Sequence, residues 1–141
     1  MLKQGFSCSQ AVLSVYCEDL GLDPDTALKI AAPFRAGMGR MGHTCGAVTG
    51  AFMVLGLRYS SVSPDDSGNR DRVCDLVQAF RREFCRKNKT IICNELVGFD
   101  VCFPEQRQAA ADKGVFATLC PGFVRDAVEI VGRMIKDAPV R

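Results

Sequence analysis

The sequence lacks any dense block of basic residues. Its 18 Lys and Arg residues are spread along 141 residues and leave a formal net charge of +2. Nucleic acids and anionic membranes both bind proteins through concentrated positive charge. We therefore expect neither a nucleic acid nor a membrane among the partners of this protein.

A long apolar run is also missing. The longest uncharged apolar run, residues 44–57, spans 14 residues, whereas a membrane-spanning helix needs roughly 20. Residues 1–5 do not resemble the apolar segment of a secretory signal peptide. The sequence therefore predicts a cytoplasmic protein in which residues 44–57 form a buried helix.

No stretch shows the alternation of polar and apolar residues that is typical of a strand. Helical periodicity instead predicts helices over residues 7–20, 24–34, 45–58, 70–87, 90–97, 104–113 and 120–137. No repeat or linker divides the chain. The fold class that follows is all-α: one domain over residues 1–141, built as a bundle of about five to seven helices.

Cysteine, by contrast, is abundant, with eight residues at positions 8, 17, 45, 74, 85, 93, 102 and 120. Without a signal peptide, a secreted disulfide framework is not expected. In a reducing cytosol, many cysteines indicate metal binding, redox chemistry or burial in a core. The pattern alone leaves these three explanations open.

Four cysteines fall at predicted helix starts: Cys8, Cys45, Cys93 and Cys120. Unpaired amides and the helix dipole favour negative charge there and can lower the pKa of a thiol. We therefore take these four as candidate catalytic and metal-binding residues. The other four cysteines are expected to pack or to be incidentally exposed.

The spacing of the candidates limits the kind of site that they can form. They are 37, 48 and 27 residues apart, and no CxxC pair of the kind found in structural zinc sites is present. A shared site must therefore be assembled by tertiary packing, and it would suit an iron–sulfur cluster or a dithiol–disulfide pair.

Cys45 is expected to be the most reactive thiol. It follows a loop with glycines at 37, 39 and 42, which predict unusual backbone dihedrals. His43, the only histidine, lies two residues before it and is a candidate ligand or tuning group. The loop lacks the lysine of a phosphate-binding P-loop, so we expect no nucleotide site.

These motifs resemble a known family. The segments are Cys8-Ser-Gln-Ala-Val-Leu13, Gly37-Met-Gly-Arg-Met-Gly-His-Thr-Cys45-Gly-Ala-Val-Thr-Gly50, Cys93-Asn-Glu-Leu-Val-Gly98 and Cys120-Pro121. Together they resemble the redox-active family named for its pattern, C_GCAxxG_C_C, over about residues 5–135. The resemblance maps the four family cysteines onto positions 8, 45, 93 and 120. It also makes Gly42, His43, Gly46 and Gly50, the companions of Cys45, candidate cofactor-binding residues.

The resemblance implies a helical redox protein. A similar domain accompanies haem in the split-Soret type of cytochrome, where an iron–sulfur centre is associated with it, so an iron–sulfur cluster is one expectation here. No CxxCH motif is present, so the chain carries no c-type haem of its own. Family members often have a further helix before the first cysteine, and a second subunit would supply that wall in a homodimer.

Three functions are weighed from the sequence. The first is a redox protein, an oxidoreductase or electron carrier, in which the four cysteines converge for iron–sulfur electron transfer or thiol–disulfide exchange with an unidentified redox partner. The second is a module that binds zinc or another metal, or senses it, without catalysis. The third is a helical interaction protein, with no cofactor, whose cysteines merely pack.

Overall fold

The computed structural model describes residues 1–140, which form helices joined by turns and one isolated antiparallel bridge between Thr44 and Ile92. This confirms the predicted all-α class. The α-helices are α1 (Cys8–Tyr16), α2 (Pro24–Ala31), α3 (Gly46–Tyr59), α4 (Ser67–Asn88), α5 (Cys93–Val97), α6 (Pro104–Asp112) and α7 (Val115–Asp137). Two short 3-10 helices, Leu2–Gln4 and Ala32–Phe34, precede α1 and follow α2.

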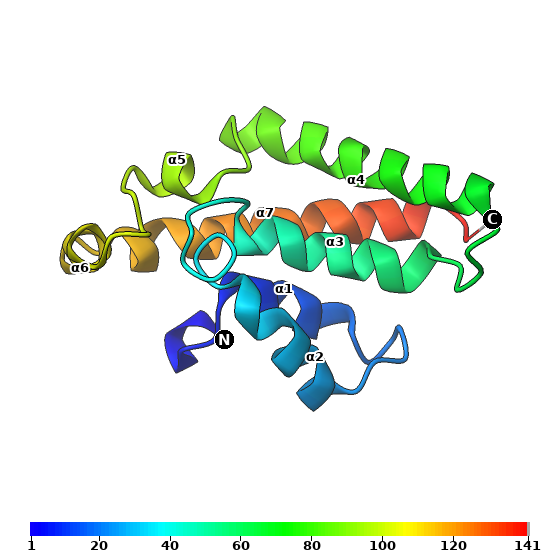
Figure 1. The fold of residues 1–141 in the computed structure, drawn as a ribbon, viewed down its shortest axis with the longest axis horizontal. Coiled ribbons are helices and arrows are strands. Elements are labelled where there is room, and N and C mark those ends of the chain that lie inside the picture. Colours follow the sequence, from blue (N-terminus) through cyan, green and yellow to red (C-terminus); the bar gives the residue numbers. More distant parts are fainter. Residues whose placement is uncertain (141) are drawn as a thin grey trace.

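Helices α3 and α7 run side by side through the middle of the molecule (Figure 1). Helix α4 packs along one side of this pair, and α1 with α2 covers the other side. The short helices α5 and α6 lie together at the end where α3 and α7 begin (Figure 1). The loops at that end are therefore placed next to the start of the central helix.

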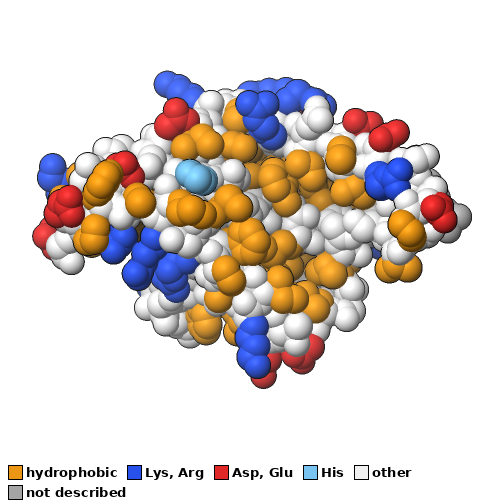
Figure 2. Space-filling model, viewed as in Figure 1, with side chains coloured by type: hydrophobic (Ala, Val, Ile, Leu, Met, Phe, Trp, Pro, Cys, Tyr) orange, Lys and Arg blue, Asp and Glu red, His pale blue; other side chains and the backbone are white. Residues whose placement is uncertain are grey.

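Helix α3 is buried on nearly every side, as the uncharged run predicted. Ala47, Val48, Ala51, Val54 and Leu55 are all fully buried, and a helix that is apolar all round belongs in the centre of a bundle. On the face shown in Figure 2, hydrophobic side chains gather across the middle while charged ones lie mostly around the edge. None of the helices in residues 1–140 combines the length and apolar character that crossing a membrane requires.

Local capping explains where helix α1 begins. Ser7 and Gln10 form a reciprocal capping box, in which each side chain accepts a hydrogen bond from the backbone amide of the other residue. This fixes Cys8 as the first residue of α1. At the other end, α1 stops at Tyr16 rather than at the predicted residue 20, because the chain turns around Cys17, whose carbonyl accepts bonds from Leu20 and Leu22.

The last helix begins earlier than predicted. The sequence indicated a start at Cys120 because proline is favoured in the first helical turn. Helix α7 instead begins at Val115, after Gly114 takes a left-handed conformation with φ +71°, and Pro121 lies inside it. A proline inside a helix removes one backbone hydrogen bond, and this helix continues past it because its following turns are packed into the core through Ala127, Ile130 and Val131.

Candidate cysteine site

The structure brings the four candidate cysteines together from four separate elements. Cys8 is the first residue of α1, Cys45 is the N-cap of α3, Cys93 is the first residue of α5, and Cys120 lies in α7. Negative charge on Cys45, Cys93 or Cys120 raises the pKa of Cys8. Charge on Cys93 or Cys120 likewise raises the pKa of Cys45. Cys8 and Cys120 also act on each other, and their interaction raises the pKa of Cys8 and lowers that of Cys120.

Close packing of α1 against α3 places Cys8 beside Cys45. A Cβ atom on Gly46 would lie 3.0 Å from the backbone nitrogen of Ser9 and 3.3 Å from Cβ of Cys8. A Cβ atom on Gly50 would lie 2.9 Å from the carbonyl oxygen of Ser9. These two glycines were predicted to bind a cofactor, and in the structure their lack of a side chain allows the two helices to touch.

A buried polar cluster holds the first turn of α1 in place. The Ser9 hydroxyl donates to the carbonyl of Ala31 at 2.8 Å, and the hydroxyls of Ser7 and Ser9 lie 3.0 Å apart. The Gln10 amide donates to the carbonyl of Leu28 at 2.9 Å. This cluster was not predicted, although polar residues at 7, 9 and 10 in a mostly apolar segment are its signal in the sequence.

The glycine-rich loop is a short left-handed turn. Five consecutive residues, 36–40, have φ between +51° and +71°, which is rare for L-amino acids because the side chain crowds the following carbonyl. Ala36, Met38 and Arg40 are not glycines, and such a conformation costs roughly 1–2 kcal/mol for each of them. The predicted unusual dihedrals are thus confirmed, and they extend beyond the glycines.

Backbone hydrogen bonds tie this loop to the start of α5. The amide of Cys93 donates to the carbonyl of His43 at 2.6 Å, and the amide of Cys45 donates to the carbonyl of Ile91 at 2.7 Å. A Cβ atom on Gly37 would lie 2.7 Å from Cβ of Cys93, so the loop lies directly on that cysteine. The bridge therefore holds Cys45 and Cys93 in one place.

The four thiols differ in acidity. The hydrogen bond from Cys8 lowers the pKa of Cys120, although burial opposes this. The same bond, together with burial and the neighbouring thiolates, raises the pKa of Cys8. Burial raises the pKa of Cys45 to about 12 and that of Cys93 to about 11. Cys120 is therefore the thiol that ionises first.

This order corrects the expectation that Cys45 is the most reactive thiol. Backbone amides of Ala47 and Val48 at the start of α3 do lower its pKa, as the helix-start argument required. Burial outweighs them, because Cys45 is 5 % exposed and its charged form loses almost all contact with water. The prediction that Cys120 caps a helix is also wrong, since Cys120 lies inside α7, and it is Cys8 that lowers its pKa.

The remaining candidates contribute through the backbone. The His43 side chain is exposed, while its amide and carbonyl bond to Gly37 and Cys93. Gly42 is buried, and a Cβ atom there would lie 2.2 Å from Oδ1 of Asn94. Asn94 had not been singled out from the sequence. Cofactor binding by these residues stays a prediction.

The other cysteines are dispersed, and all eight are free thiols. Cys17 is buried in the core, as expected, and its thiol donates to the carbonyl of Ser14 at 3.7 Å. Cys74 and Cys102 are exposed, and Cys85 is half-buried on α4.

The arrangement of the four thiols of the site can be compared with the ligand geometry that a metal ion requires. Within residues 1–140, no three His, Cys, Asp or Glu side chains are arranged so that they could hold a metal ion. The thiols of Cys8 and Cys120 act on each other and lie next to two buried thiols, Cys45 and Cys93. As they stand, the four side chains do not fit an iron–sulfur cluster or zinc.

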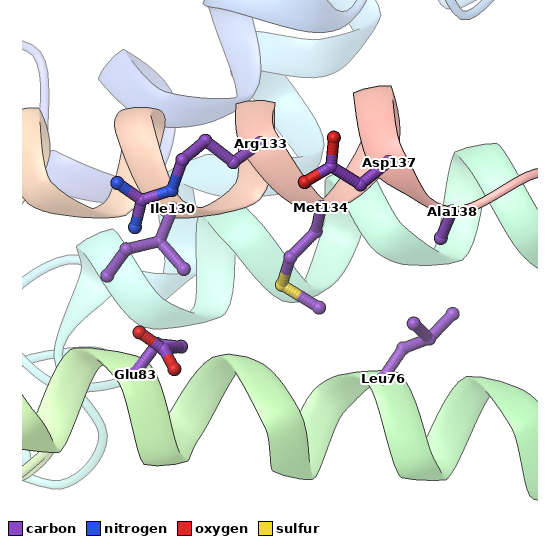
Figure 3. A pocket seen from close by; sticks show the side chains of 7 residues that line it. All are labelled: Leu76, Glu83, Ile130, Arg133, Met134, Asp137 and Ala138. Atoms are coloured by element: carbon purple, nitrogen blue, oxygen red, sulfur yellow. The ribbon is translucent and has the colours of Figure 1, made fainter.

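Two hollows lie outside the cysteine set. One, of about 480 Å³, opens between α4 and α7, and Figure 3 shows Leu76 and Glu83 of α4 facing Ile130 and Met134 of α7 across it. The other, of about 430 Å³, is apolar and lies between the left-handed turn and α3, lined by Phe34, Met38, Thr44, Thr49, Phe52 and Met53. No cysteine lines either hollow.

Comparison with known proteins gives one match. The family model described as "Putative redox-active protein (C_GCAxxG_C_C)" matches residues 6–134, a span that includes all four cysteines of the site. No curated protein and no solved structure matches the chain.

Proposed function

Because the chain belongs to the C_GCAxxG_C_C family, whose members are described as redox-active, we propose that it carries out thiol–disulfide exchange through Cys120 and Cys8. The observation that carries this proposal is the pairing of the two thiols, in which Cys8 lowers the pKa of Cys120. The thiolate is the attacking form of cysteine, and Cys120 is half-buried rather than sealed in the core. It is therefore the most readily ionised thiol of the site, and it is not sealed in the core.

The exchange takes place in two steps that balance. The Cys120 thiolate attacks one sulfur of a partner disulfide, a mixed disulfide forms, and the other partner sulfur leaves as a thiolate. Cys8 then gives up its proton and attacks Sγ of Cys120, which releases the second partner thiolate. The two cysteines are oxidised to a disulfide, and the partner disulfide is reduced to one thiol, which takes the proton of Cys8, and one thiolate.

Cys45 and Cys93 do not compete with Cys120 for the partner disulfide. Their raised pKa values, about 12 and about 11, keep both thiols protonated at neutral pH. Both are buried, at 5 % and 8 % exposure. A protonated, buried thiol is a poor nucleophile, so the first attack falls to Cys120.

The test is to oxidise the reduced protein with a small disulfide such as oxidised glutathione and to map the products by mass spectrometry. We expect a Cys8–Cys120 disulfide in the wild type. In Cys8→Ala, which lacks the resolving thiol, glutathione should stay attached to Cys120. If oxidation instead gathers at the exposed Cys74 and Cys102, exchange at this site is refuted.

Iron–sulfur cluster binding is a second candidate, favoured by a different observation. Charge on Cys120 raises the pKa of Cys8, Cys45 and Cys93, and charge on Cys93 raises those of Cys8 and Cys45, because like charges are held close together. A cationic cluster would relieve that repulsion, with Cys8, Cys45, Cys93 and Cys120 as ligands after their side chains turn. Protein purified without oxygen would then be brown and contain stoichiometric iron, whereas colourless protein with bound zinc would indicate a metal-binding module.

A further inference from the structure

Asn94 stands directly after Cys93 and joins three segments around it. Its side-chain Oδ1 accepts a hydrogen bond from the amide of Val101 at 2.9 Å, and its Nδ2 donates to the carboxylate of Asp100 at 3.1 Å. Its backbone amide donates to the carbonyl of Gly42 at 3.2 Å. The two partners of the carboxamide also fix its orientation, because one is a donor and the other an acceptor.

The Asn94 side chain occupies the space that a side chain at position 42 would need. A Cβ atom on Gly42 would lie 2.2–2.3 Å from Oδ1, Cγ and Nδ2 of Asn94. The carboxamide therefore lies flat against the glycine. This contact presses the left-handed turn onto the start of α5, where Cys93 lies.

Val101, whose backbone amide donates to Asn94, packs in one cluster with two cysteines of the site. It is fully buried and packs in one cluster with Cys93, Val97 and Cys120. Its carbonyl accepts a hydrogen bond from Arg107 of α6 at 2.8 Å, and the amide of Asp100 donates to Gln106 of α6 at 2.8 Å. The carboxamide of Asn94 thus links Cys93 to the helix that packs against α7.

From these contacts we infer that Asn94 is a positioning residue that holds Val101 and the left-handed turn against Cys93 and so keeps its thiol buried beside Cys120. The inference rests on the proposed function only in taking Cys93 as one of the two buried thiols beside the reacting Cys8–Cys120 pair. It concerns the fully reduced protein, so it can fail while disulfide exchange stands, and the reverse also holds.

The test is the rate at which iodoacetamide modifies Cys93 in the reduced protein, divided by the rate at Cys17. Cys17 is 1 % exposed and lies in the core outside the site, so it reports opening of the whole fold. Asn94→Ala removes both side-chain bonds and leaves the buried Val101 amide without its partner. We expect the Cys93-to-Cys17 ratio to rise about tenfold, because local opening becomes easier while global opening affects both thiols alike.

Asp100→Asn is the matched control. The new carboxamide oxygen can still accept from Asn94 and from the amide of Cys102, which the Asp100 carboxylate now does at 3.1 Å. The ratio should then stay within about twofold of the wild type, since the bonding pattern around Asn94 is kept.

A milder pair of variants keeps the test open if Asn94→Ala does not fold. Asn94→Asp retains the acceptor for Val101 but sets its carboxylate against Asp100, and Asn94→Asp with Asp100→Asn restores a donor–acceptor pair. Hydrogen exchange at the Val101 amide should be faster in the single variant and return to the wild-type rate in the double variant. An unchanged thiol ratio in Asn94→Ala, or exchange at Val101 that the second substitution does not restore, would overturn the inference.

Discussion

At the scale of single residues, Cys8 and Cys120 show how one hydrogen bond separates two otherwise similar thiols. Both are half-buried. Cys8 donates its proton toward Cys120, so the negative charge is favoured on Cys120 and disfavoured on Cys8. The bond therefore assigns the roles of attacking and resolving cysteine before any partner arrives.

Removing the thiol of Cys8 should slow the alkylation of Cys120. In Cys8→Ala, burial is left to act alone on Cys120 and its pKa rises, so alkylation at pH 7 should be about tenfold slower than in the wild type. Cys8→Ser keeps a hydroxyl donor at the same place and should slow the reaction less than about threefold. The exposed Cys102 serves as the reference thiol in each sample.

Equal rates at Cys120 in the wild type and in Cys8→Ala would show that the bond does not set its acidity. Equal slowing in the alanine and serine variants would attribute the effect to the shape of the side chain rather than to the donor. Either result would remove the observation on which the proposed exchange depends.

At the scale of elements, the left-handed turn determines how close α3 and α5 can come. Gly37 has φ +71°, and a Cβ atom there would lie 2.6 Å from the amide nitrogen of His43 and 2.7 Å from Cβ of Cys93. Gly98, which ends α5, has a similar φ of +78° but no atom within 4 Å of the same position. The two glycines therefore share a backbone conformation and differ in the space around them.

Gly37→Ala and Gly98→Ala should separate these two effects. Gly98→Ala carries only the cost of the left-handed backbone, roughly 1–2 kcal/mol of the free energy of unfolding. Gly37→Ala carries that cost and a clash with backbone, so we expect a total of about 3 kcal/mol or more. Urea unfolding of the reduced proteins measures both, and equal losses would show that the turn does not press on Cys93.

The elements also show what the sequence could and could not predict. The uncharged run 44–57 predicted the buried α3 because burial follows directly from composition. The start of α7 was wrong because Pro121 fits a first turn as well as an interior position that tertiary packing stabilises. The order of the pKa values could not be predicted for a related reason. Helix starts are local features, whereas the burial of Cys45 and the interaction of Cys8 with Cys120 come from contacts between distant segments.

At the scale of the whole molecule, the four-cysteine site couples folding to pH. The folded protein holds Cys45 at a pKa of about 12 and Cys93 at about 11, above the ordinary value of 9.0. Between these values the unfolded chain has released protons that the folded chain still binds. The contribution of these two thiols to the free energy of unfolding is therefore fully present below about pH 9. It is lost as the pH rises toward 11 and 12.

Unfolding in urea at pH 8, 9 and 10.5, with a phosphine reductant to keep all thiols reduced, measures this dependence. We expect a loss of roughly 1–3 kcal/mol between pH 9 and 10.5. In Cys45→Ala with Cys93→Ala the decline should become shallower, whatever the variant's stability at pH 8. Tyr16, whose pKa burial also raises, is present in both proteins and cancels in the comparison. Cys8 is also present in both, but charge on Cys45 and Cys93 helps to raise its pKa, so the difference includes their effect on Cys8. Parallel declines in the two proteins would mean that these buried thiols ionise as readily in the folded state as in the unfolded chain. The fold would then not raise their pKa values.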